Sequence, residues 1–223
     1  MEAALYFLKK RLFLAVAAAL LVVGGGFYLY YNSEAMVLKR LARDNPQSRD
    51  LLDSINRAKT QLAESKDNKL KVEALLDIAV AKTALGDLKG AVDAYSELLK
   101  INPTHNIAHE NLASIYVTQG RYDKAEIEYL TVIATQPHLI DPYLRLADLY
   151  LAHMKEKKNV VPAVLTFGMN QNGKHPALLE KLIQYYFDRE LYLLAGEQAD
   201  ELLKIDPGNA FAKDILSQIE ARS

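Results

Sequence analysis

Apolar residues follow two different patterns along this chain. Between Leu12 and Tyr31, a mostly apolar run of twenty residues contains no charged side chain. From Leu51 to Ile219, apolar residues recur every three or four positions among polar ones, which is the spacing of one face of an amphipathic helix. The first pattern predicts a helix that is apolar on every side, and the second predicts a series of amphipathic helices that share a core.

The uncharged run is long enough to cross a lipid bilayer. A helix of this length rises roughly 30 Å at about 1.5 Å per residue, which matches the hydrocarbon thickness of a membrane. Aromatic residues, whose rings favour the headgroup layer, close its far end: Phe27, Tyr28, Tyr30 and Tyr31. We therefore predict that residues 1–33 form a short N-terminal tail and a transmembrane anchor, which contacts the membrane from Leu12 to Tyr31.

Two alternatives to an uncleaved anchor remain open. A buried core helix would normally show a polar face, which this segment lacks. A cleaved signal peptide is the stronger alternative, because Ser33-Glu34-Ala35 resembles a small-x-small cleavage site. However, the run is longer than the apolar region of about 7–15 residues that is usual in signal peptides. We therefore favour the uncleaved anchor.

Basic residues predict the orientation of this anchor. Lys9, Lys10 and Arg11 lie immediately before the run, whereas the basic residues after it start only at Lys39 and are mixed with acidic ones. Because basic residues accumulate on the cytoplasmic side, we expect a single-pass protein of the cell (inner) membrane, with a cytoplasmic N-terminus and the rest of the chain extracytoplasmic. Small residues would also permit self-association through the transmembrane helix: Ala15, Ala19, Gly24, Gly25 and Gly26.

The amphipathic part of the chain repeats itself with a period of 34 residues. Identical residues stand one period apart at four places: Gly86 and Gly120, Ala91 and Ala125, Tyr95 and Tyr129, and Pro103 and Pro137. In each period, the glycine lies between two runs of helical spacing, where a left-handed helix end needs no Cβ. The proline then stops the second run. A period of this length predicts an array of stacked helix pairs.

These residues resemble the tetratricopeptide repeat family, whose pattern ends each helix pair with a proline. The second repeat carries the family pattern in full: His109, Leu112, Ala113, Tyr116, Gly120, Ala125, Tyr129 and Pro137. The first repeat departs from it at Lys82, where a Tyr is usual. The third loses the turn glycine and gains four residues around Lys155–Asn159, and the fourth has Glu190 in place of the glycine.

The resemblance covers residues 70–207 and implies the fold class. We expect an all-α protein with a tetratricopeptide-type helical-repeat superhelix of about four helix pairs behind one N-terminal transmembrane helix. Residues 34–69 carry an amphipathic stripe, which predicts a leading helix or a degenerate repeat. Residues 208–223 show a last apolar stripe with polar residues at the end, which predicts a C-terminal capping helix.

No pattern in the sequence indicates catalysis. Cysteine is absent, which excludes disulfides and thiolate chemistry, and neither a phosphate-binding glycine loop nor a nucleophile elbow occurs. The net charge is −1 and no basic block is present, so we expect no nucleic-acid partner. His105 and His109 are four residues apart, but His109 occupies a packing position of the repeat. We therefore expect no enzymatic activity, no metal and no cofactor.

The resemblance implies a binding surface for another protein. In this family, the first helix of each pair lines a concave groove that holds a peptide or a partner helix. Carried over by position, the predicted protein-binding residues are Leu76, Val80, Thr83, Glu110, Ser114, Val117, Leu144, Asp148, Leu151, Glu180, Gln184 and Phe187. This set is mixed apolar and acidic, which suits an amphipathic or partly basic segment. Alternatively, several of these residues pack against the leading helix or the C-terminus.

Together these features predict a membrane-anchored scaffold or adaptor. It would dock a partner protein or peptide in the groove for the assembly of an envelope or secretion complex. A holdase-like chaperone beside a translocation machine is the alternative. Both interpretations rest on architecture, which does not identify a pathway.

Overall fold

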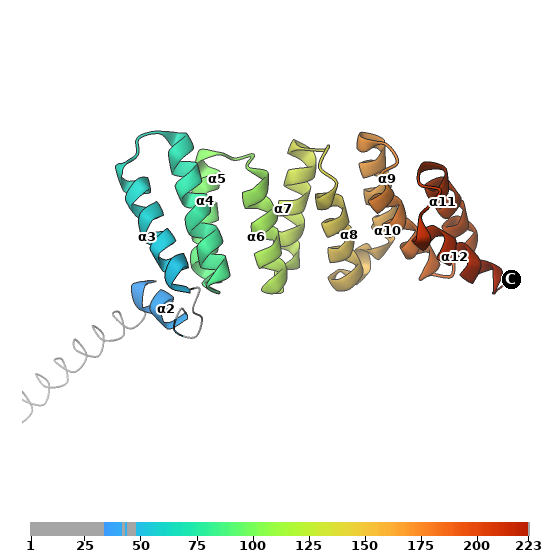
Figure 1. The fold of residues 1–223 in the computed structure, drawn as a ribbon, viewed down its shortest axis with the longest axis horizontal. Coiled ribbons are helices and arrows are strands. Elements are labelled where there is room, and N and C mark those ends of the chain that lie inside the picture. The colour runs from blue at the N-terminus through green and yellow to red at the C-terminus, as the bar shows by residue number, and fades with distance from the viewer. Residues whose placement is uncertain (1–33, 42, 44–47, 223) are drawn as a thin grey trace, which may run out of the picture. The chain divides into compact units, whose positions relative to one another are not determined.

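The computed structural model describes residues 34–41, 43 and 48–222, and nearly all of these lie in helices joined by short turns (Figure 1). The predicted anchor, Leu12 to Tyr31, lies outside the described residues. No helix within the described part is both long and apolar enough to span a membrane. The chain divides into two compact units, with the boundary after Glu97.

Unit 1 is built around an antiparallel pair of helices. Its described helices are α2 (Glu34–Leu41), α3 (Ser48–Glu64), α4 (Asn68–Ala84) and α5 (Leu88–Ile101), which continues past the unit boundary. The helices α3 and α4 pack side by side and are joined by three residues. Asp67 ends this connection and caps α4, because its Oδ1 accepts a hydrogen bond from the Lys69 amide at 2.7 Å.

The short helix α2 packs on this pair of helices. Leu38 is only 4% exposed and belongs to a buried cluster with Ile55 of α3, Ala81 of α4 and Leu85. Leu38 therefore places one side of α2 in the core of unit 1. The predicted leading segment, residues 34–69, contains the two helices α2 and α3. Burial of this cluster ties the first described residues of the chain to the first repeat.

Unit 2 consists of helix pairs that pack in chain order. Its remaining described helices are α6 (Asn106–Thr118), α7 (Tyr122–Thr135), α8 (Asp141–His153), η1 (Lys155–Val160), α9 (Val161–Asn172), α10 (Pro176–Phe187), α11 (Tyr192–Ile205) and α12 (Ala210–Glu220). Each helix from α6 to α12 contacts the next (Figure 1). Ala113, Ala125 and Ala147 are completely buried. Alanine at these positions allows close approach of neighbouring helices without leaving voids.

The 34-residue period also appears in the hydrogen bonds of unit 2. The Nε2 atom of His109 lies 2.9 Å from the carbonyl oxygen of Pro103. One period later, the hydroxyl of Tyr143 donates to the carbonyl oxygen of Pro137 at the same distance, 2.9 Å. The first helices α6 and α8 are thus each tied to the turn before them by a ring at the same repeat position.

The third repeat accommodates its extra residues in the 3-10 helix η1. Lys157 of η1 forms an ion pair with Glu126 of α7, and the same carboxylate accepts a hydrogen bond from the Tyr150 hydroxyl. The insertion is therefore anchored to the preceding helix pair by one shared carboxylate.

The turn between the two helices contains a left-handed residue in the first, second and fourth repeats. Gly86 and Gly120 adopt φ angles of 80° and 69°, and Glu190 adopts a φ of 59° at the equivalent place in the fourth repeat. A residue with a Cβ pays roughly 1–2 kcal/mol for this conformation. The missing glycine of the fourth repeat therefore leaves backbone strain at Glu190.

Replacing Glu190 with Gly is expected to stabilise the protein. Relief of the strain outweighs the extra entropy of glycine in the unfolded chain, which costs about 0.4–1 kcal/mol, so a net gain of about 0.5–1 kcal/mol should remain. Chemical denaturation followed by circular dichroism would measure it. The reverse substitution, Gly120→Glu, is the matched control and should be destabilising; a loss of stability in Glu190→Gly would contradict this explanation.

Candidate functional site

Nine of the predicted binding residues lie on the three first helices of unit 2. Of the three predicted residues on each helix, the exposed one is polar: Ser114 on α6, Asp148 on α8 and Gln184 on α10. The other six are half-buried: Glu110, Val117, Leu144, Leu151, Glu180 and Phe187. None of the nine is fully buried, so all remain reachable from solvent. We call these nine residues the first-helix face.

Charges at the start of α6 and α8 influence one another across this face. Arg145 donates from Nε to Asp141 Oδ2 at 3.1 Å, which pairs those two side chains. Burial raises the pKa of Glu110, and the negative charge of Asp141 raises it further, while Arg145 opposes the shift. Glu110 is therefore a partly buried carboxyl group that would gain from an additional positive charge beside it.

Most other polar groups of the face already have partners within the protein. Lys181 of α10 donates to Asp148 of α8 at 2.6 Å, which links the two helices. Gln184 donates to Asp188 at 2.6 Å, one turn further along the chain. Asp148 and Gln184 thus have hydrogen-bond partners within the protein. The apolar side chains of the face then remain as the surface from which a partner could exclude water.

The C-terminal part of the chain covers one end of the face. Asn209, which caps α12, donates to Glu180 Oε1 at 3.0 Å. The ring of Phe187 meets that of Tyr192 edge to face at 5.6 Å, and the guanidinium of Arg222 lies 4.8 Å from the Phe187 ring centroid. Glu180 and Phe187 thus have internal contacts. The other apolar residues of the face are Val117, Leu144 and Leu151, which are half-buried.

The other three predicted binding residues lie on α4 of unit 1. Val80 is 47% exposed, and Leu76 and Thr83 are half-buried. The Thr83 hydroxyl donates to the Ala79 carbonyl at 2.8 Å within the same helix. Val80 is therefore the most accessible apolar side chain of this set in unit 1.

Unit 1 also contains a cleft that sequence reasoning did not predict. Its volume is 590 Å³, and it is bounded by residues of α2 through α5. Leu62, Leu75 and Ile78 supply its apolar lining, and Lys82 is part of its charged wall. In the sequence, the only sign of this cleft is Lys82, which stands where the family pattern has a Tyr.

The counter-ion of Lys82 comes from α2. Lys82 is 7% exposed, and its Nζ lies 2.6 Å from Glu34 Oε1 and 4.0 Å from Asp87 Oδ2. Glu34 also pairs with Lys59 of α3 at 2.9 Å. Burial raises the pKa of Glu34, but the hydrogen bonds from Lys82 and Lys59 outweigh it, so the pKa lies below its ordinary value. Glu34 therefore joins α2 to both helices of the pair.

Two of the repeats match a known protein family. The family model described as tetratricopeptide repeat matches residues 76–138. These residues are tetratricopeptide repeats. The match covers the two repeats that carry the sequence pattern most fully, and it confirms the predicted family for this part of the chain. A comparison with curated proteins finds no match.

Solved structures of tetratricopeptide repeat proteins share the fold. A repeat protein from Parabacteroides merdae aligns over 82% of this chain and 70% of its own, with 17% identity and a TM-score of 0.59. MamA from Desulfovibrio magneticus aligns over 80% of this chain and 98% of its own, with 16% identity and a TM-score of 0.54. YrrB, described as having an unusual peptide-binding site, aligns over 74% and 82%, with 15% identity and a TM-score of 0.52. The predicted all-helical repeat fold is confirmed.

The contacts of the histidine of the second tetratricopeptide repeat favour its cationic form. His109 is 7% exposed; its Nδ1 lies 2.6 Å from Glu128 Oε2, and its Nε2 faces the Pro103 carbonyl oxygen. A carbonyl oxygen only accepts, so both ring nitrogens must donate if Glu128 is ionised. The hydrogen bond to Glu128 raises the pKa of His109, against the opposing effect of burial. His109 is thus a structural residue, and His105 caps α6 by accepting from the Ala108 amide.

The His109–Glu128 pair predicts a pH dependence of stability. Because the folded pKa of His109 is raised, its contribution is fully present below the unfolded value near 6.5 and is lost as pH rises through the folded pKa. Between the two values, the free energy of unfolding should fall as pH rises, by at most about 1.4 kcal/mol per pH unit. Urea unfolding from weakly acidic to weakly alkaline pH would measure it. The control is His109→Tyr, because Tyr is the residue at the equivalent position 143 of the next repeat and does not titrate in this pH range. This variant should lose the pH dependence; an unchanged pH dependence would contradict the role given to His109.

Proposed function

We propose that this protein is a membrane-anchored, non-enzymatic scaffold that docks a protein or peptide on its first-helix face. The observation that carries the proposal is the set of half-buried apolar side chains on that face. Val117, Leu144 and Leu151 are half-buried, and on the same face Asp148, Glu180 and Gln184 are hydrogen-bonded within the protein. An apolar surface framed by satisfied polar groups is the composition of a protein interface core. The peptide-binding site named for YrrB, which shares the fold, supports this class of function.

The chemistry of the face favours an amphipathic partner that carries basic residues. Apolar side chains of the partner would cover Val117, Leu144 and Leu151. Glu110, whose pKa is raised by burial and by Asp141, would be stabilised as a carboxylate by a Lys or Arg of the partner. Such a segment satisfies both features at once, whereas an acidic segment would increase the repulsion at Glu110.

The anchor in the proposal rests on the uncharged run from Leu12 to Tyr31. The chain continues into α2 only three residues later, at Glu34. Cleavage after Ala35 would remove Glu34 and leave Lys82 with Asp87 as its counter-ion at 4.0 Å. This loss argues for an uncleaved anchor. The inner membrane and a cytoplasmic N-terminus are proposed from Lys9, Lys10 and Arg11, which lie immediately before the run. The scaffold would then hold its partner at the membrane during assembly of an envelope or secretion complex.

Two substitutions on the first-helix face test the proposal. Val117→Lys and Leu151→Lys should reduce partner recovery after crosslinking in intact membranes by tenfold or more, since each introduces a charge worth about 1.4 kcal/mol or more into an apolar contact. Their stability should fall by no more than about 1 kcal/mol, because a half-buried Lys can extend its amine to water. A core role would give the opposite order, with unfolding first.

Leu193→Lys is the matched control for these variants. Leu193 is 78% exposed on the second helix α11, so the same change of charge occurs away from the first-helix face. Partner recovery should stay at the level of the unmodified protein. Equal recovery for all three variants would place recognition elsewhere and overturn the proposed docking face.

A further inference from the structure

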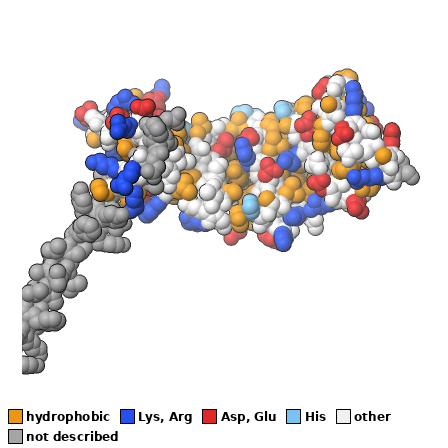
Figure 2. Space-filling view, turned by 60° about the horizontal axis from the view of Figure 1, so that its bottom comes forward, with side chains coloured by type: hydrophobic (Ala, Val, Ile, Leu, Met, Phe, Trp, Pro, Cys, Tyr) orange, Lys and Arg blue, Asp and Glu red, His pale blue; other side chains and the backbone are white. Residues whose placement is uncertain are grey.

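The outward side of α2 is basic, and it follows the predicted anchor directly. Lys39, Arg40 and Arg43 are all exposed. Figure 2 shows Lys and Arg side chains gathered at the end of unit 1 where α2 lies. We infer that this basic side of α2 binds the acidic phospholipid headgroups of the membrane that holds the anchor. The inference rests on the proposed anchor and applies to either orientation, because its chemistry is that of the headgroup.

The docking of α2 fixes which side carries the charge. Leu38 is buried with residues of α3 and α4, so one side of the helix is committed to the core. Glu34 is the only acidic residue of α2, and its carboxylate is paired with Lys82 and Lys59. The exposed positive charge that this part of the chain presents to its surroundings therefore includes Lys39, with Arg43 just beyond the helix.

The short distance to the predicted span brings this charge to the membrane surface. Tyr31 and Glu34 are three residues apart, which is at most about 10 Å of extended chain. Lys39 follows Glu34 by five residues, or roughly 8 Å along a helix. These two lengths set an upper limit of about 18 Å between Tyr31 and Lys39. The headgroup layer and the screening length at physiological salt together extend about 13–16 Å from the hydrocarbon, so Lys39 comes within this range when the connection is shorter than its fully extended length. Residues 39–44 carry two net positive charges, because Asp44 offsets one of the three basic residues. Each basic residue near an acidic lipid surface contributes about 1 kcal/mol of attraction.

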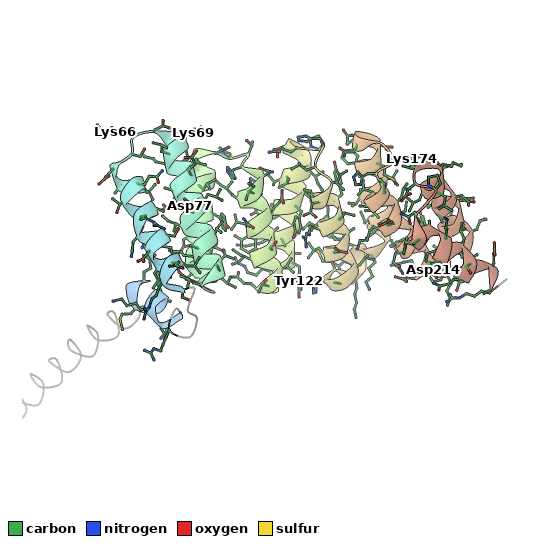
Figure 3. The ribbon with its side chains drawn as sticks, viewed as in Figure 1. Lys66, Lys69, Asp77, Tyr122, Lys174 and Asp214 are labelled. Carbon is green, nitrogen blue, oxygen red and sulfur yellow. The ribbon has the colours of Figure 1, made fainter. Side chains whose placement is uncertain are left out.

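Chemical labelling of lysines in vesicles tests this contact. The full chain is reconstituted into vesicles of phosphatidylcholine alone or of an equimolar mixture with phosphatidylglycerol, and a membrane-impermeant amine reagent labels outward-facing molecules. Lys66 is the internal reference, because it lies at the end of the α3–α4 pair away from α2 (Figure 3). The ratio of Lys39 to Lys66 labelling should be roughly fivefold lower in the acidic vesicles, and high salt should restore it.

Two charge-matched variants identify the source of the protection. Arg43→Gln should raise the Lys39 to Lys66 ratio in acidic vesicles by severalfold. Lys69→Gln removes the same charge at the opposite end of α4 and should leave the ratio unchanged (Figure 3). Equal ratios in the two kinds of vesicle, or equal effects of the two variants, would overturn the inference.

An alkaline carbonate wash of the same vesicles separates this inference from the anchor. Retention of the protein in both kinds of vesicle, together with equal labelling ratios, would refute the headgroup contact and leave the anchor standing. Release from both kinds would refute the anchor and the headgroup contact together. Retention with protection of Lys39 only in acidic vesicles is the expected result.

Discussion

Replacing Ala125 with Leu is expected to lower the free energy of unfolding by about 1–3 kcal/mol. Ala125 is completely buried on α7, which packs against α6 in the second tetratricopeptide repeat. Three additional carbon atoms do not fit between close-packed helices unless the backbone or neighbouring side chains move. Urea unfolding of the full chain in a mild detergent, followed by circular dichroism, would measure the change.

Ala134→Leu is the matched control for this overpacking. Ala134 lies on the same helix but is exposed, so the larger side chain can extend into solvent. Its effect should stay within about 0.5 kcal/mol, as is usual for surface positions. Equal unfolding midpoints for the two variants would show that Ala125 is not a helix contact, and the repeat would have to be placed differently.

Removal of the Glu34 carboxylate is expected to destabilise unit 1 by about 1–2 kcal/mol. The change leaves the nearly buried amine of Lys82 with a single, more distant counter-ion, Asp87. Breaking a fully buried pair costs about 3–5 kcal/mol, but the Glu34 side chain is 46% exposed, so solvent screening reduces the effect. Urea unfolding of Glu34→Ala would measure the loss.

A double-mutant cycle isolates the interaction of Glu34 with Lys82. Lys82→Tyr introduces the residue found at the equivalent positions of the later repeats, and Glu34→Ala should cost much less in that background. Asp93→Ala is the control for loss of a carboxylate, because its pair with Lys89 is exposed on both sides and contributes little. Equal costs of Glu34→Ala with and without Lys82 would contradict the proposed role of the ion pair.

The same cycle bears on the signal-peptide alternative. If Glu34 stabilises the repeats, a chain cleaved after Ala35 should be less stable than the uncleaved chain by a similar amount. In the uncleaved chain, α2 would then connect the predicted anchor directly to the first repeat through its contacts with α3 and α4.

Several features of this protein could be predicted from its sequence because they depend on short-range order. The 34-residue period identified the tetratricopeptide repeats that the family model matches at residues 76–138. The turn positions were identified by Gly86 and Gly120, since a left-handed residue at a helix end is a local requirement of the backbone. The same reasoning marked Glu190 as unusual, and its φ angle shows that the turn keeps its geometry without the glycine.

Other features were decided by tertiary structure alone. The pairing of Lys82 with Glu34 joins residues that are 48 positions apart, and no periodic pattern relates them. The contacts of Phe187 with Arg222 and of Glu180 with Asn209 likewise depend on where the last helix packs. Helical periodicity specifies which side of a helix is apolar, but it does not specify which neighbour covers that side. The counter-ion of Lys82, the cleft of unit 1 and the extent of the uncovered first-helix face were therefore set by packing between distant segments.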